Sequence, residues 1–175
     1  MREVQSLIDS VADARAKYLA EVNSLSPHQI NHKVSDEVWN AIEITEHLYW
    51  AEQNGLVAIY KTIQAKAEGK TVWEGEHFNK GLPIETIIER TWKPKETVPA
   101  SAAPRLGGPI DLWTAYLQSL DVPLKALVNK LTDEDLDIIT FPHPISGSFD
   151  IRQRLDFLKF HLNRHREQVA TLKLY

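Results

Sequence analysis

Cysteine is absent from this chain of 175 residues. Its absence excludes disulfides, thiolate nucleophiles and every metal site built on cysteine. Seven histidines are present, so any metal ion must be bound through nitrogen and oxygen ligands. A chain of this length buries enough surface to fold without a metal or a covalent crosslink.

Long apolar runs and an excess of positive charge are also missing. No apolar segment approaches the roughly 20 residues of a membrane span. The first residues do not resemble a signal peptide, because Asp9, Asp13 and Arg15 interrupt their apolar positions. The net charge of -4, from 20 basic and 24 acidic residues, gives no electrostatic reason to expect a nucleic-acid partner. We therefore expect a cytoplasmic protein with neither a membrane nor a nucleic-acid partner.

Apolar residues recur every three or four positions along most of the chain, which is typical of amphipathic helices. The pattern predicts long helices over residues 3–25, from about 35 to 68, over 110–131 and from about 150 to 172. Pro123 is expected to kink or divide the third of these. Residues 26–29 indicate either one capped helical turn or a bare loop.

A long stretch between the second and third helices, residues 70–109, is punctuated by proline and glycine, with one short helix predicted over 84–91. A connection of this length is either functional or wrapped across the domain. We therefore predict a single all-α domain, residues 1–175. It is a four-helix bundle with a long crossover between helices 2 and 3.

Two histidines, His161 and His165, lie four residues apart, which places their side chains about 6 Å apart along the helix axis. His165 fills a gap in the apolar stripe, so both side chains can face the interior. A metal site needs a third ligand from another helix, and His47 is the best candidate. His28 and His32 share the spacing but lie in a polar turn, so we expect them to face solvent. Spacing alone leaves open whether His161 and His165 bind a metal ion or share this spacing by accident.

The residues around these histidines resemble a known family. Residues 25–31 (LSPHQIN), Trp39 and residues 44–48 (ITEHL) resemble the first signature of the DinB-like (DinB/YfiT) superfamily. Residues 143–147 (HPISG) and 160–169 (FHLNRHREQV) are similar to its second signature. The two blocks lie in the expected order and span nearly the whole chain.

The resemblance implies a four-helix bundle in which three histidines hold a divalent metal ion, often zinc or nickel. Carried over to this sequence, the ligands are His47, His161 and His165. His28 and His32 stand where the family often has an acidic and an aromatic residue, and neither belongs to the triad. Family members often form homodimers, so a homodimer is expected here as well.

Three histidine ligands leave coordination positions open, as in a catalytic site where a metal activates water or a substrate thiol. Some members of the family transfer low-molecular-weight thiols and others resemble hydrolases. Because this chain has no cysteine, a thiol nucleophile would have to be a cosubstrate. We therefore expect a metal-dependent thiol transferase or hydrolase of a small molecule. The alternative is a non-catalytic, metal-stabilised binding or stress-response module.

Four further residues near the histidines have open roles. Glu43, one helical turn before His47, either orients a ligand or acts as a general base, or is a solvated or structural carboxylate. Tyr49 and Trp50 either line the pocket or belong to the core. His143 either reaches the mouth of the site or is a plain loop histidine.

Overall fold

The structure is a computed structural model that describes residues 2–92 and 98–175. Within these ranges the helices are α1 (Glu3–Asn23), α2 (Pro27–Asn31), α3 (Ala41–Ala67), α4 (Ile84–Thr91), α5 (Ile110–Ser119), α6 (Asp121–Ala126) and α7 (Ile151–Thr171). Three short 3-10 turns span Leu127–Asn129, Asp133–Asp137 and Leu172–Leu174. No helix in the described ranges is long and apolar enough to cross a membrane.

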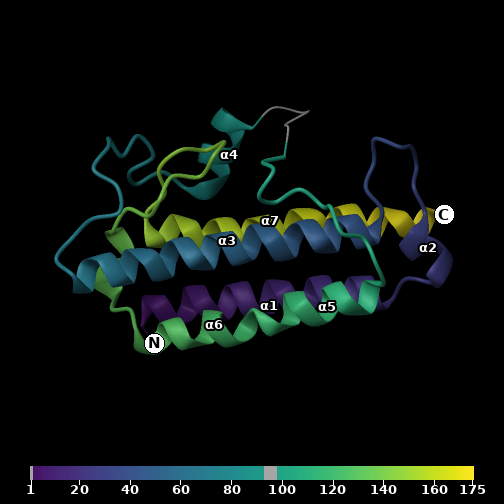
Figure 1. The fold of residues 1–175 in the computed structure, drawn as a ribbon, viewed down its shortest axis with the longest axis horizontal. Coiled ribbons are helices and arrows are strands. Elements are labelled where there is room, and N and C mark those ends of the chain that lie inside the picture. The colour runs from purple at the N-terminus through teal and green to yellow at the C-terminus, as the bar shows by residue number, and fades with distance from the viewer. Residues whose placement is uncertain (1, 93–97) are drawn as a thin grey trace.

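The long helices form a four-helix bundle, which confirms the predicted fold class (Figure 1). In the view of Figure 1, α3 and α7 form one layer, and α1 with α5 and α6 forms the other. Helices α1 and α7 run in one direction, and α3 and α5 run in the opposite one. In this view α4 lies above α3 and α7, and the last part of the crossover runs down past these two helices to the start of α5. Residues 93–97, with Pro94, lie outside the described residues.

The core joins the apolar stripes of these helices. In α1 the stripe comprises Val4, Ile8, Val11, Tyr18 and Val22, each at most 1% exposed. It packs against α7, whose buried apolar side chains include Leu155, Leu158, Leu162 and Val169. Burying one such side chain contributes about 1.5–3 kcal/mol. At the centre, the hydroxyls of Tyr18 and Thr45 form a hydrogen bond of 2.7 Å between α1 and α3.

Helix α3 begins later than the sequence predicted. It starts at Ala41, because the side chain of Asn40 accepts the N–H of Glu43 and the carboxylate of Glu43 accepts the N–H of Asn40. The expected start near residue 35 is therefore wrong. Val38, which that start placed in the core, is 38% exposed. The predicted stop is confirmed, since Gly69 has φ +66° directly after the helix cap.

Two other boundaries resolve alternatives that the sequence left open. Ser26 and Gln29 form a reciprocal capping box, so the residues after α1 are a short helix, α2. The third long helix is divided at Leu120 into α5 and α6, three residues before Pro123. Proline has no N–H to continue the hydrogen-bond ladder, which explains the interruption.

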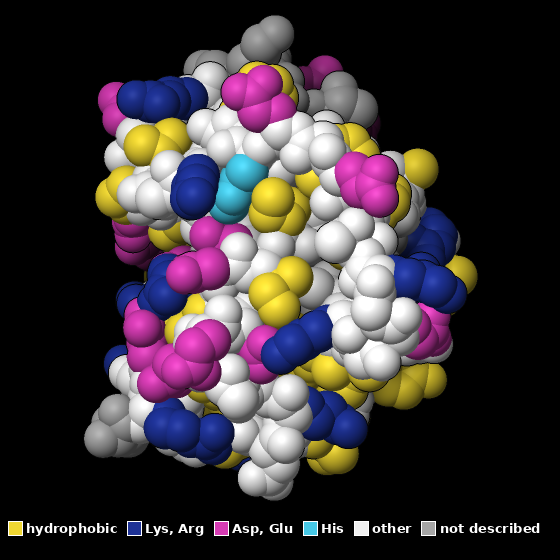
Figure 2. All heavy atoms as spheres, turned by 90° about the vertical axis from the view of Figure 1, so that its left-hand side faces the viewer, with side chains coloured by type: hydrophobic (Ala, Val, Ile, Leu, Met, Phe, Trp, Pro, Cys, Tyr) yellow, Lys and Arg dark blue, Asp and Glu magenta, His cyan; other side chains and the backbone are white. Residues whose placement is uncertain are grey.

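The end of the bundle that faces the viewer in Figure 2 carries acidic and basic side chains interspersed among apolar ones. The described part of this face therefore shows no continuous field of one sign. This mixture agrees with the small net charge of -4.

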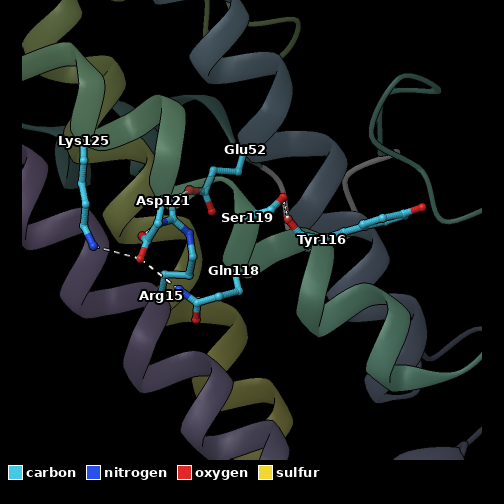
Figure 3. A network of polar contacts seen from close by, with 7 residues as sticks. All are labelled: Arg15, Glu52, Tyr116, Gln118, Ser119, Asp121 and Lys125. Atoms are coloured by element: carbon cyan, nitrogen blue, oxygen red, sulfur yellow. Dashed lines mark hydrogen bonds and ion pairs between the residues drawn. The ribbon is translucent and has the colours of Figure 1, made fainter.

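A charged cluster is buried between three helices (Figure 3). Arg15 of α1 is fully buried and forms ion pairs with Glu52 of α3 and Asp121 of α6. The second carboxylate oxygen of Asp121 accepts hydrogen bonds from Gln118 at 2.9 Å and Lys125 at 3.1 Å. Both charges of the Arg15–Glu52 pair have lost their water, so each depends on the other.

The variant Arg15→Met leaves the carboxylate of Glu52 buried without its cation. We expect the free energy of unfolding to fall by about 3–5 kcal/mol, as measured by urea denaturation. Adding Glu52→Leu removes the orphaned charge and recovers much of this loss. Lys17→Met, which removes an exposed partner of Asp13, changes stability little. Equal losses for the Arg15 and Lys17 variants would contradict this account.

Candidate metal centre

The structure brings together the three histidines that the sequence grouped. His47 lies near the start of α3, His161 lies at the middle of the antiparallel α7, and His165 lies one turn further along α7. One ring nitrogen of each lies within 4.8 Å of the others. The Nε2 atom of His161 is 3.1 Å from Nε2 of His47 and 3.0 Å from Nε2 of His165. All three side chains are buried, with exposures of 5–7%.

Hydrogen bonds behind the rings determine which nitrogen faces the centre. Nδ1 of His47 lies 2.8 Å from the carbonyl oxygen of Ala102, which can only accept a hydrogen bond. Nδ1 of His165 lies 2.8 Å from Oε1 of Gln168. In both residues Nδ1 is therefore the donor, and the lone pair of Nε2 is directed to the centre.

Aromatic side chains enclose the imidazole rings. Trp39 lies with its ring centroid 5.0 Å from that of His47. Phe157 stacks on His161 at 5.4 Å with an interplanar angle of 19°, and the ring of Trp92 meets His161 edge-on at 6.1 Å. These contacts hold the rings in place and keep bulk water away from one side of the cluster.

Burial is the main electrostatic influence on the triad. It lowers the pKa of His47, although the hydrogen bond to Ala102 partly opposes the shift. Burial, with a smaller contribution from the neighbouring His47, lowers the pKa of His165 to about 3. For His161, burial and then its two histidine neighbours hold the pKa well below its usual value. All three rings are therefore neutral at pH 7, which is the protonation state that binds a metal.

Glu46 precedes His47 and attaches the crossover to α3. Its carboxylate accepts the backbone N–H groups of Arg105, Leu106 and Gly107 at 2.8, 2.9 and 3.0 Å. Burial alone would raise the pKa of Glu46, but these three bonds and one from the indole of Trp50 outweigh it and lower the pKa. Ala102 belongs to the same part of the crossover, residues 102–107, which we call the returning segment because it leads back to the bundle. Glu46 therefore helps to place the carbonyl that orients His47.

A cavity of about 430 Å³ opens onto the triad. Its walls are mostly apolar and include Trp39, Trp92, Phe141, Pro142 and Phe157. His143 also lines it, which places this loop histidine at the site. Tyr49 and Trp50 do not line it and instead cluster with Trp113 and Tyr116.

The remaining candidates, Glu43, His28 and His32, do not line the cavity. Both carboxylate oxygens of Glu43 have other partners, since one accepts the N–H of Asn40 and the other pairs with Lys33 at 2.8 Å. The structure thus gives Glu43 a helix-capping role. His28 is exposed, as expected, whereas His32 is half-buried and stacks on Tyr175 at 4.4 Å.

Comparison with known proteins identifies the family. The family model of the DinB superfamily matches residues 11–169. This chain belongs to the DinB superfamily. YuaE of Bacillus subtilis, an uncharacterized protein, is 26% identical over an aligned length of 167 residues, covering 92% of this chain and 93% of YuaE.

A solved structure shares the DinB-type fold. It is YfiT from Bacillus subtilis, described as a probable metal-dependent hydrolase with an unusual four-helix bundle topology. The two structures superpose with a TM-score of 0.66 at 17% sequence identity. The match covers 98% of this chain and 86% of YfiT. At this identity the likeness establishes the four-helix fold.

Sequence reasoning missed several residues that support the site. Gln168 lies three positions after His165, a spacing at which helical side chains meet, so it was readable from the sequence. Glu46 gave no such signal, because its partners are backbone groups 59–61 residues away. The hydrogen bond from His47 to the Ala102 carbonyl could not be predicted either, since every residue type has a backbone carbonyl.

The variant Glu46→Gln removes the charge that holds residues 105–107. We expect the amide hydrogens of Arg105, Leu106 and Gly107 to exchange about tenfold faster or more, as measured by NMR. In the wild type the lowered pKa means that this protection is present above the usual glutamate pKa. The protection is lost as the pH falls through the lowered pKa, after correction for the intrinsic exchange rate. Glu43→Gln is the control and leaves these amides protected. Unchanged exchange in Glu46→Gln would show that other contacts hold the segment.

Proposed function

We propose that this DinB-superfamily protein holds a divalent metal ion through His47, His161 and His165 and hydrolyses a small-molecule substrate. The supporting observation is the convergence of three buried Nε2 atoms at one end of an apolar cavity. YfiT, which shares the fold, is described as a probable metal-dependent hydrolase.

The donor set fits a borderline transition-metal ion. Three neutral imidazole nitrogens suit zinc, nickel or copper better than magnesium or calcium, which prefer oxygen ligands. We propose zinc or nickel. When bound, such an ion with open coordination positions supplies Lewis-acid activation of water or of a substrate group.

The chain's own residues provide the remaining functions. The carbonyl of Ala102 and the amide of Gln168 hold two of the rings with Nε2 facing the centre. The aromatic walls bind the apolar part of a substrate and exclude water around it. Transfer of a cosubstrate thiol is the second candidate reaction, because a chain without cysteine leaves the open positions to a thiol from outside.

Metal binding is tested on protein purified without a metal-affinity tag. We expect elemental analysis to find about one ion per chain. His161→Ala lowers the metal affinity by about a hundredfold or more, and Gln168→Leu by about 10–100-fold, because outer hydrogen bonds orient the ligands. His28→Ala removes an exposed histidine outside the triad and leaves the affinity unchanged. Equal affinity of His161→Ala and wild type would overturn the proposal.

Activity is tested with the metal-loaded protein on a panel of small esters and amides, with a parallel arm of thiols plus an electrophile. We expect turnover in the hydrolytic arm, and its loss after chelation and in His165→Ala. Turnover in the thiol arm alone would replace hydrolysis by thiol transfer. If the metal raises the melting temperature while neither arm shows turnover, the protein is a metal-stabilised binding module and the hydrolase proposal fails.

A further inference from the structure

Arg154 is a buried cation on the wall of the cavity. It lies on α7 seven residues before His161, and its side chain is only 4% exposed. Nε and one terminal nitrogen donate hydrogen bonds to Oγ1 of Thr140 at 3.3 and 3.1 Å, and that terminal nitrogen also bonds the carbonyl of Phe141. The other terminal nitrogen has no hydrogen-bond partner among the described residues.

No carboxylate within the described ranges lies at ion-pairing distance from Arg154. The contrast with Arg15 is informative, because that equally buried arginine has two carboxylate partners. Burial lowers the pKa of Arg154 to about 10, which still leaves the guanidinium charged at neutral pH. A buried charge without a counterion is costly, so an anion in the cavity would be stabilised there.

A second donor, His143, lines the same cavity, and its ring and the Arg154 guanidinium both lie near the ring of Phe149, at 5.6 and 5.0 Å. Nδ1 of His143 accepts the backbone N–H groups of Ile145 and Ser146 at 3.2 and 3.1 Å. Nδ1 therefore carries no hydrogen, and Nε2 carries the proton as a neutral donor. Burial and then the charge of Arg154 lower the pKa of His143 to about 3, so the ring stays neutral.

The rest of the lining adds positive charge and no negative charge. Arg164, an exposed residue, also lines the cavity, and its guanidinium lies 5.2 Å from the ring of Trp92. The described lining residues include two arginines and four histidines, and neither aspartate nor glutamate. The cavity thus combines apolar walls with donors and a cationic group.

We propose that Arg154 anchors a carboxylate of the substrate, with the Nε2–H of His143 as a second donor. The substrate class is then a small carboxylic acid with an apolar part that packs on the aromatic walls. The reaction of this substrate rests on the proposed function, whereas the binding of its carboxylate is argued from Arg154 and His143 alone.

The test compares two probes of nearly equal shape, 3-phenylpropanoate and its neutral amide, 3-phenylpropanamide. Their affinities for the purified full-length protein are measured by calorimetry at pH 8. We expect the acid to bind about tenfold tighter or more, because a hydrogen-bonded ion pair replaces a neutral contact. Wild-type protein that binds the amide as tightly as the acid would overturn the proposal without any variant.

Variants then assign the preference to a residue. Arg154→Gln brings the ratio of the two affinities to about one while the amide affinity stays the same, which shows that the cavity is intact. Arg152→Gln is the matched control on the same helix, since Arg152 pairs with Glu3 and Asp137 and does not line the cavity. If Arg154→Gln does not fold, Arg154→Lys tests the same point, because it keeps the charge but not the forked geometry and gives an intermediate ratio.

A last variant separates this inference from the proposed metal site. His161→Ala disrupts the triad, and we expect the preference for the acid to persist in it. If the preference is lost in His161→Ala and kept in Arg154→Gln, a metal ion and not Arg154 holds the carboxylate, and the inference fails while the metal site stands. If His161→Ala binds metal as tightly as wild type while Arg154→Gln loses the preference, the proposed function fails and the anion site stands.

Discussion

The attachment of the crossover to α3 is the contact on which the geometry of the site depends. Glu46 holds the backbone of residues 105–107, and its neighbour His47 donates a hydrogen bond to the carbonyl of Ala102. Two adjacent residues of one helix therefore fix both ends of the same returning segment. The ring of His47 is oriented by a part of the chain that lies more than 50 residues further along. The histidine cluster is thus a product of the crossover as much as of the helices that carry it.

The two buried arginines show how the bundle divides its charges. Arg15 meets two carboxylates between α1, α3 and α6, and all three groups belong to the framework (Figure 3). Arg154 is held by a hydroxyl, a carbonyl and the ring of Phe149, all of them neutral, so no described carboxylate balances its charge. In a low-dielectric interior the ion pairs of Arg15 hold α1, α3 and α6 together. The unpaired charge of Arg154 instead favours an anionic ligand in the cavity.

The helical bundle and the grouping of three histidines were predictable because both depend on local periodicity and on a recognisable pair of motifs. The start of α3 was predicted too early, although the signal for it is in the sequence: Glu43 follows Asn40 by three residues and completes a capping box, whereas Ser35 has Val38 at that position. The supporting contacts of His47 were beyond reach, because they use backbone atoms of the crossover. The position of Arg154 on the cavity side of α7 could have been predicted, since a residue seven positions before His161 lies on the same helical face.

Both helices that carry the histidines begin at a reciprocal capping box, Asn40 with Glu43 in α3 and Asp150 with Gln153 in α7. Each cap fixes where its helix starts, and hence the direction in which every later side chain points. Removing one residue between a cap and its histidine would turn the imidazole by about 100° around the helix axis. Changes of length in the surface loops of the crossover leave this angle untouched. The two caps therefore fix the number of residues from Asn40 to His47 and from Asp150 to His165, whereas the surface loops of the crossover that precede Ala102 can vary in length.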